Sequence, residues 1–273
     1  MTLRQAVADN GADVTRLYIL GNAEGTADVD WRNDAVEATR AHLERFYNFA
    51  REVLADKSID ESAEKTLIDR WMLSRLQRRI AEATEAMENI QTRRALQSAF
   101  YLLFNDLRWY QRRGGKNQLR AVLSAWVRMM SPFTPHVCEE IWAAGLGEGY
   151  ASLAEWPAAD AALMDERAEK AEDLLEKTLK DVQEIVSVTK AQPKKITLYA
   201  APAWKKEMLR LALDNVQANE GKLDMGALMK QAMASPAIAE HKKDAPKYAQ
   251  KLAKAAHSLS AEALGLDEFE TLS

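Results

Sequence analysis

The chain has 273 residues, of which 47% are hydrophobic and 29% charged, a balance typical of a globular protein with a substantial core. The net charge is only −4, and the single cysteine, Cys138, excludes a disulfide framework and a thiolate metal site. With 11 glycines and 7 prolines, the composition favours long helices over a turn-rich β architecture. No apolar run approaches membrane-spanning length and the first ten residues lack a signal-peptide pattern, so we expect a cytoplasmic protein.

Apolar residues recur at steps of three and four along most of the chain, which predicts a mainly α fold. The first 22 residues are expected to form two short helices separated at Asn10 and Gly11, because glycine can adopt a left-handed cap conformation. Longer helices with short connections then predict an antiparallel bundle. We expect the bundle helices at about 34–54, 64–90, 92–113, 119–133 and 135–144.

Capping residues and prolines predict where several of these helices begin. Thr92 is expected to cap the helix that follows it. Pro132 and Pro135 each follow a Ser or Thr, so each proline is expected to be the first residue of a restarted helix.

The C-terminal third of the chain combines helices with one predicted strand. A link over residues 146–164 precedes a long helix over about 165–189, and further helices are expected at about 203–217, 224–234 and 244–257. Lys194–Ala201 (KKITLYAA) alternates apolar and polar residues and is the only convincing strand. Because one strand cannot satisfy its own edges, either a weak strand is hidden or the chain stops within a small α/β module. We expect a truncated module.

Positive charge is concentrated in two stretches. Residues 70–130 contain 12 Lys or Arg against 4 Asp or Glu, and residues 194–256 contain 12 against 6, whereas the stretches before and between them are acidic. Such segregation suits a polyanionic partner that is held at two places. The alternative is that these charges only keep helix faces solvated.

The sequence predicts no self-sufficient active site. His136 lies two residues from Cys138, a separation that points the two side chains in different directions on a helix, so we expect His136 to be a buried structural histidine. Glu139 and Glu140 are adjacent, so their carboxylates diverge and cannot share a proton. We therefore expect no catalytic, cofactor-binding or metal-binding residue in this chain.

Two clusters of basic residues are candidates for binding phosphate. In the segment 109–116 (WYQRRGGK), arginine forks can bind phosphates, whereas Trp109 and Tyr110 are expected to pack in the core. A second patch lies at the predicted strand and the helix after it, where lysines act as point charges. The candidates in these clusters are Arg112, Arg113, Lys116, Lys194, Lys195, Lys205 and Lys206.

Several motifs resemble class I aminoacyl-tRNA synthetases of the leucine, isoleucine and valine group. These motifs are GADVTRLYIL, WMLSRLQRRI and SPFTPHVCEEIW, and LYILGNAEGTADVDW is most similar to the archaeal type of leucyl-tRNA synthetase. The resemblance covers nearly the whole chain from Leu3. The His-Ile-Gly-His and Lys-Met-Ser-Lys-Ser signatures of the family are absent, so both ends are expected to be boundaries within a longer protein.

The resemblance implies a C-terminal part of a leucyl enzyme, with four regions. These are stem-contact helices (1–33), an anticodon-binding-type helical bundle (34–160), a connecting helix (161–193) and a truncated α/β module (194–273). Such a part would position the body of leucine tRNA, and would be inactive without its upstream catalytic domain. The complete enzyme would use ATP and Mg to attach leucine to tRNA.

By position, the resemblance adds Arg75, Arg78 and Arg79 to the candidates for tRNA contact, on the RNA-facing side of the bundle. Asp13 and Arg16 are implied to brace an active-site loop rather than to touch substrate. We expect a monomer that binds tRNA and does not bind membranes. Two alternatives remain open: a helical scaffold whose basic faces meet an acidic protein, and the same region of a valyl or isoleucyl enzyme.

Overall fold

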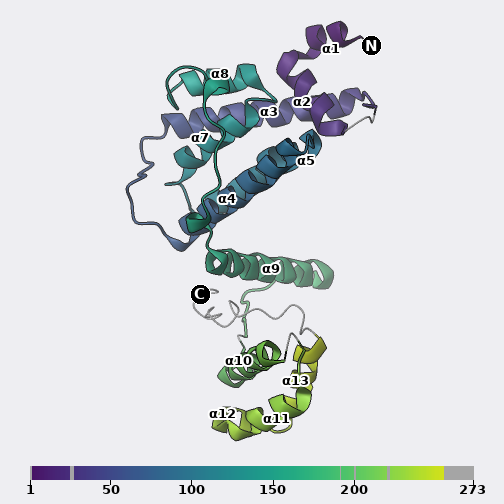
Figure 1. Cartoon of the computed structure of the whole chain (residues 1–273), viewed down its shortest axis with the longest axis vertical. Coiled ribbons are helices and arrows are strands. Elements are labelled where there is room, and N and C mark those ends of the chain that lie inside the picture. Colours follow the sequence, from purple (N-terminus) through teal and green to yellow (C-terminus); the bar gives the residue numbers. More distant parts are fainter. Residues whose placement is uncertain (1, 25–27, 191, 200, 220–221, 255–273) are drawn as a thin grey trace. The chain divides into compact units, whose positions relative to one another are not determined.

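The protein is represented by a computed structural model that describes residues 2–24, 28–190, 192–199, 201–219 and 222–254 (Figure 1). The chain divides into two compact units, Met1–Asp165 and Glu166–Ser273. The described residues of both units are helical or irregular, so the predicted mainly α fold is confirmed.

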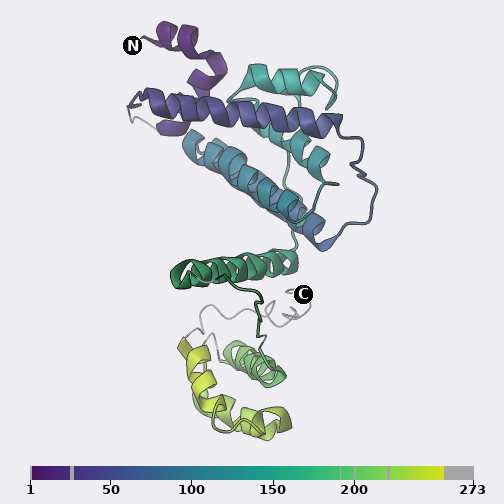
Figure 2. The ribbon, with the colours of Figure 1, turned by 180° about the vertical axis from the view of Figure 1, so that it is seen from behind.

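The first unit is a helical bundle in which the long helices α3 and α4 run through most of its length (Figure 2). A π-helical segment, Gln97–Leu102, joins α5 to α6, so that these three elements form one continuous rod that packs against α4. Helix α7 contacts both α3 and α4 and closes the bundle. The helices are α1 (Leu3–Asn10), α2 (Ala12–Asn22), α3 (Asn33–Ala55), α4 (Leu67–Glu88), α5 (Thr92–Leu96), α6 (Leu103–Arg112), α7 (Leu119–Met130) and α8 (Pro135–Ala143).

Aromatic side chains from four elements form the centre of this bundle. The Trp126 ring of α7 is fully buried, and its centroid lies 4.5 Å from that of Phe46 on α3. The Phe100 and Phe104 rings approach it at 6.2 and 5.6 Å from the π-helical segment and α6. Because each of these rings removes a large apolar area from water, their contact fixes the positions of the four elements against one another.

The helix boundaries agree with most of the local signals in the sequence. Gly11 separates α1 from α2 with φ of +83°, a conformation that suits glycine. Thr66 and Asp69 form a reciprocal capping box at the start of α4. Pro135 is the first residue of α8, as predicted.

Two predicted helix starts are wrong. Pro132 lies in a turn over residues 131–133 and starts no helix. Thr92 is itself the first residue of α5, and its hydroxyl donates to the Leu20 carbonyl 3.2 Å away on α2 instead of capping its own helix. At Pro132 a tight turn replaces the expected helix start. At Thr92 the bond to α2 replaces the expected capping bond.

The second unit contains α9 (Glu166–Thr189), α10 (Ala203–Ala218), α11 (Met225–Ala234), α12 (Pro236–Ala239) and α13 (Ala245–Lys254). The last four pack around a common core whose buried members include Trp204, Met208, Leu228, Ile238 and Leu252. Residues 255–257 of the last predicted helix, and the chain end on which the predicted truncation depends, lie outside the described residues.

The strand predicted at Lys194–Ala201 is wrong for the part that the structure describes. Residues 192–199 are irregular and exposed, and the apolar side chains of Ile196 and Leu198 are 53% and 46% accessible. The alternation of apolar and polar residues has no physical consequence here, because no described segment offers the backbone a partner strand. The described part of this unit is therefore α-helical rather than α/β; Ala200 lies outside it.

Candidate nucleic-acid interface

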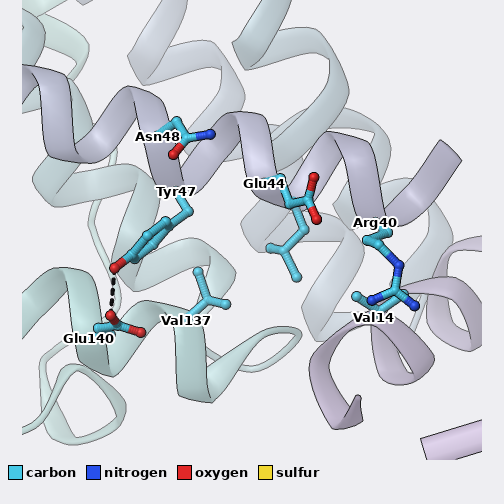
Figure 3. A pocket seen from close by; sticks show the side chains of 8 residues that line it. Val14, Arg40, Glu44, Tyr47, Asn48, Val137 and Glu140 are labelled. Atoms are coloured by element: carbon cyan, nitrogen blue, oxygen red, sulfur yellow. Dashed lines mark hydrogen bonds between the residues drawn. The ribbon is translucent and has the colours of Figure 1, made fainter. Parts of the chain in front are cut away.

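A pocket of about 390 Å³ lies between α2, α3 and α8 in the first unit (Figure 3). On its wall the Tyr47 hydroxyl donates to the Glu140 carboxylate, and this hydrogen bond raises the pKa of Tyr47. Arg40, at the other end, donates to the Asn10 side-chain oxygen 2.9 Å away. The described residues that line the pocket include no Ser, Cys or His, so they form no nucleophile–base pair.

The described part of the chain offers neither a metal cluster nor a membrane-spanning helix. It contains no group of three or more His, Cys, Asp or Glu that could hold a metal ion. No helix in the described ranges is both long and apolar enough to cross a bilayer. The remaining chemical feature is the pair of basic stretches.

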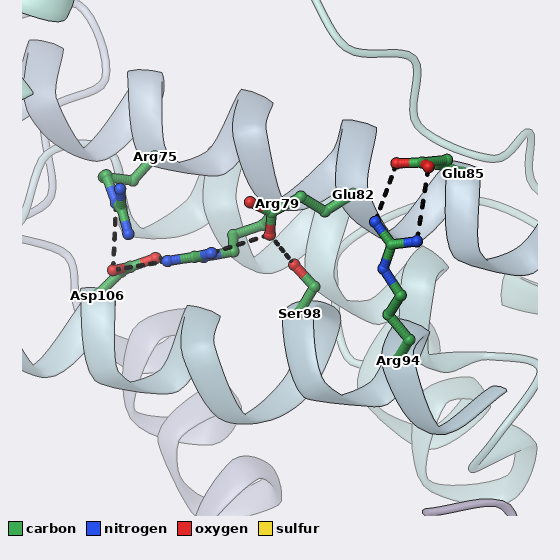
Figure 4. A network of polar contacts seen from close by, with 7 residues as sticks. All are labelled: Arg75, Arg79, Glu82, Glu85, Arg94, Ser98 and Asp106. Atoms are coloured by element: carbon green, nitrogen blue, oxygen red, sulfur yellow. Dashed lines mark hydrogen bonds and ion pairs between the residues drawn. The ribbon is translucent and has the colours of Figure 1, made fainter. Parts of the chain in front are cut away.

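The arginines of α4 form a ladder of polar contacts with the rod α5–α6 (Figure 4). The Arg79 Nε donates to Asp106 Oδ2 at 2.7 Å, and its Nη1 donates to Glu82 Oε2 at 2.9 Å. Glu82 in turn accepts a hydrogen bond from the Ser98 hydroxyl. Charge-assisted contacts between two helices fix their register, so this ladder belongs to the architecture of the bundle.

Because of this ladder, the candidate arginines of α4 expose different amounts of surface. The Arg79 side chain is only 7% exposed, and although burial opposes its charge, the contacts with Asp106 and Glu82 raise its pKa. Arg75 is half-buried with its Nε 3.4 Å from Asp106 Oδ1, and Arg78 is also half-buried. Arg79 therefore presents almost no surface to a ligand, and Arg75 presents a reduced one.

Other arginines of the first basic stretch also bind within the protein. Arg120 donates to the carbonyls of Leu54 and Asp56. Arg128 donates to the Glu155 carbonyl 3.3 Å away. These contacts satisfy backbone acceptors at a helix end and in a loop, which reduces the positive charge available to a partner.

Asp106 organises the ladder, but it is not among the residues singled out from the sequence. It is the only Asp or Glu between Arg94 and Arg128, on a helix that is otherwise basic. This isolated acidic residue among basic ones is the feature of the sequence that could have predicted its role. A lone carboxylate at an 8% exposed position requires a cationic partner.

The end of α6 carries one exposed part of the first basic stretch. Arg108, Arg112 and Arg113 are exposed there, and the Arg112 guanidinium carbon lies 5.6 Å from the centroid of the half-buried Trp109 ring. Lys116 is exposed, and its Nζ donates to the Ser58 hydroxyl at 3.1 Å. We call Arg108, Trp109, Arg112 and Arg113 the basic turn.

Tyr110 anchors the basic turn in the core, as predicted for this aromatic residue. Its fully buried hydroxyl donates to Asp69 and accepts the Gln118 N–H at 3.1 Å. Burial and the hydrogen bond to Asp69 raise the pKa of Tyr110. The ring leaves no room beside Gly115, because a Cβ there would lie 2.0 Å from Tyr110 Cε2.

In the second unit the candidate lysines lie in two different settings. Lys194 and Lys195 are exposed in the irregular segment before α10. Lys205 and Lys206 are half-buried in the first turn of α10, and the Lys205 Nζ lies 5.7 Å from the Trp204 ring centroid.

Asp13 joins the motif GADVTRLYIL to the motif SPFTPHVCEEIW. Its Oδ2 accepts the backbone N–H of Val137 at 2.9 Å, and its Oδ1 lies 2.9 Å from Arg16 Nη1 and 2.8 Å from His136 Nδ1. The prediction that His136 is buried is wrong, because its side chain is 73% exposed and only the partner carboxylate is buried. In this structure Asp13 braces helix α8.

Comparison with known proteins agrees with this architecture. Residues 69–198 match the family described as the anticodon-binding domain of tRNA ligase. Leucine–tRNA ligases of Methanothrix thermoacetophila and Methanosarcina acetivorans are 65% and 49% identical over 100% and 98% of this chain. The chain spans 28% of the length of each of these two relatives.

A solved structure shows a similar fold. It is the LeuRS of Agrobacterium radiobacter K84 agnB2, crystallised as a ternary complex with tRNA and LeuAMS. It superposes with a TM-score of 0.54 and 24% sequence identity, covering 60% of this chain and 22% of that one. Over its whole length the chain is therefore similar to one part of leucine–tRNA ligases, and residues 69–198 of it match the anticodon-binding domain of tRNA ligases.

Proposed function

We propose that this chain is the tRNA-binding part of a leucine–tRNA ligase, an enzyme that attaches leucine to its tRNA with ATP and Mg. The chain positions the tRNA and contributes no catalytic residue, so it is inactive without the catalytic part of the enzyme. Its sequence identity with two leucine–tRNA ligases supports this assignment, and the Agrobacterium relative was crystallised with tRNA.

The observation that carries the proposal is the basic turn at the end of α6. Three arginines are exposed there on a segment that Tyr110 fixes to the core, beside a half-buried Trp109. A guanidinium donates two parallel hydrogen bonds to a phosphate, and a rigid support lowers the entropy lost on binding. Lys116, Arg75 and Arg78 are secondary candidates, because each is already engaged or half-buried.

The proposal retains the four functional regions expected from the resemblance. Residues 1–33 connect to the catalytic part, 34–160 form the tRNA-holding bundle, 161–193 connect, and 194–273 form a C-terminal module. The protein acts in the cytoplasm as a monomer whose partners are tRNA and its own catalytic domain.

Binding to leucine tRNA across a salt series tests the function. Release of counterions makes the logarithm of the binding constant fall linearly with the logarithm of the salt concentration. The double variant Arg112→Ala, Arg113→Ala should reduce this slope by about 2 and leave the melting temperature unchanged. The control Lys177→Ala, Lys180→Ala removes the same charge from exposed positions of the acidic stretch and should leave the slope unchanged.

Three outcomes would contradict the proposal. A folded chain that fails to bind at low salt would reject tRNA binding. Tighter binding of valine or isoleucine tRNA than of leucine tRNA would favour the same region of a valyl or isoleucyl enzyme. An acidic protein partner that tRNA cannot displace would favour the interaction scaffold.

A further inference from the structure

A second pocket, of about 410 Å³, lies within the second unit and was not predicted from the sequence. Its walls come from the first turn of α10 and from one face of α13. On α13, Lys251 lies four residues after Lys247 and three after Tyr248, and all three side chains border the pocket. The volume falls within the range of small-ligand pockets, about 300–1,000 Å³.

The aromatic floor of the pocket is held rigidly by the core of the unit. The Trp204 ring is 7% exposed and stacks on His241 at a centroid distance of 4.9 Å and an angle of 21°. Tyr248, which is half-buried, meets the edge of Trp204 at 5.6 Å. Because these rings pack on one another, the floor keeps its shape without a ligand.

Three lysines surround this floor. The Lys205 Nζ lies 5.7 Å from the Trp204 centroid and 5.6 Å from the Tyr248 centroid, so its ammonium is held over aromatic faces. Lys247 and Lys251 are exposed on the same side. Within the described residues none of the three forms an ion pair, and Asp244 is the only carboxylate among those that line the pocket.

We propose that this pocket binds one unpaired nucleotide of an RNA strand, with its phosphate among Lys205, Lys247 and Lys251 and its base against Tyr248. The inference rests on the proposed function, because it assumes that the chain binds RNA. Unpaired bases stack on exposed aromatic rings, whereas the bases of a duplex stay stacked on each other and cannot enter a concave site. An acidic peptide would use the lysines and leave the ring unused.

Binding of a fluorescent ten-nucleotide single-stranded RNA to the full chain tests the proposal. Each phosphate contact on a single strand contributes about 0.7 to the salt slope, and the pocket holds one phosphate, so Lys247→Ala, Lys251→Ala should reduce the slope by about 0.7. The matched control Lys242→Ala, Lys243→Ala removes the same charge from exposed residues of the adjoining turn and should leave the slope unchanged. Tyr248→Leu should weaken binding about tenfold, since it removes one stacked base.

The proposal predicts that the same sequence in a blunt duplex binds more weakly than the single strand and does not respond to Tyr248→Leu. Equal losses in the lysine variant and its control would reject the pocket in favour of diffuse attraction. Displacement of the RNA by poly-glutamate at equal charge concentration would identify the site as one for acidic peptides. Circular dichroism of each variant confirms that the unit remains folded.

Failure of this inference is distinguishable from failure of the proposed function. If only the pocket is wrong, leucine tRNA still binds and Arg112→Ala, Arg113→Ala still weakens it, while the Lys247 and Lys251 variant matches its control. If the proposed function is wrong, the unmodified chain binds neither tRNA nor the single strand.

Discussion

The carboxylate of Asp13 caps helix α8 through the backbone N–H of Val137, 2.9 Å from Asp13 Oδ2. The N-cap residue Thr134 makes no side-chain capping bond, and its hydroxyl turns back toward the Met130 carbonyl. A buried residue of α2 therefore supplies the acceptor that the start of α8 lacks, and its negative charge also suits the positive end of the helix dipole.

Replacing this cap should loosen α8. We expect Asp13→Ala to lower the free energy of unfolding by about 1–2 kcal/mol, the usual cost of losing an N-cap acceptor. Urea denaturation followed by circular dichroism measures the change. His136→Ala removes an exposed side chain on the same carboxylate and should cost less than about 0.5 kcal/mol. Equal losses in the two variants would show that the contact between His136 and Asp13, rather than the cap, holds α8.

Removal of the Asp106 carboxylate should be far more costly. Asp106→Ala leaves the buried Arg79 guanidinium without its main partner, and breaking such a pair costs about 3–5 kcal/mol. The double variant Arg79→Met, Asp106→Leu should recover most of this loss, because neither charge then remains buried. Urea midpoints of the three proteins provide the test, and a double variant no more stable than Asp106→Ala would disprove a role based on pairing.

Stability should fall in acid through Glu82. Burial opposes ionisation of this carboxyl, but hydrogen bonds from Ser98 and Arg79 and the Arg79 charge hold its pKa below the ordinary 4.5. Because the unfolded chain then binds the proton more readily, the contribution is complete above pH 4.5 and is lost as the pH falls below it.

Thermal unfolding between pH 3 and pH 7 checks this. Glu82→Gln should flatten the decline in melting temperature, whereas Glu88→Gln, an exposed change on the same helix, should retain the full decline. Identical profiles for all three proteins would contradict the prediction.

The two glycines after α6 should respond differently to alanine. Gly114 has φ of +80° with open space around its Cβ position, so Gly114→Ala should cost about 1 kcal/mol of backbone strain. Gly115→Ala should cost about 3 kcal/mol, since the new methyl overlaps the Tyr110 ring and displaces its hydroxyl from Asp69. Melting temperatures of the two variants give their order of stability. A larger loss for Gly114→Ala than for Gly115→Ala would show that overlap with the Tyr110 ring does not determine the cost.

Cys138 should be unreactive until the first unit unfolds. Burial raises the pKa of its thiol to about 12, and the side chain is completely inaccessible. Iodoacetamide at pH 8 should therefore label it only in urea, with a midpoint that matches circular dichroism. Rapid labelling of the native protein would show that α8 opens locally.

The bundle could be predicted because its information is local. Apolar spacing placed α3, α4 and α7 within a few residues of their observed limits, and Gly11 and Pro135 gave two of the boundaries. The failures came where a local preference had a tertiary competitor. Thr92 bonds to α2 instead of capping, and residues 192–199 alternate in polarity but meet no partner strand among the described residues.

The candidate site could be predicted only in part. The basic stretch and the burial of Tyr110 followed from composition and periodicity, but the sequence did not distinguish Arg79 from Arg112. That difference depends on Asp106, which is 27 positions away from Arg79 along the chain and reaches it only because α4 and α6 are antiparallel neighbours.

The sequence by itself determined the helices, the segregated charge and the likeness to a known family, since each is recorded in neighbouring residues or short motifs. Only the tertiary structure decided which charges are exposed, which residue caps α8, and that Lys205 and Tyr248 meet at one pocket. A helical period fixes which residues share a face, whereas the partner of that face is chosen by packing between distant segments.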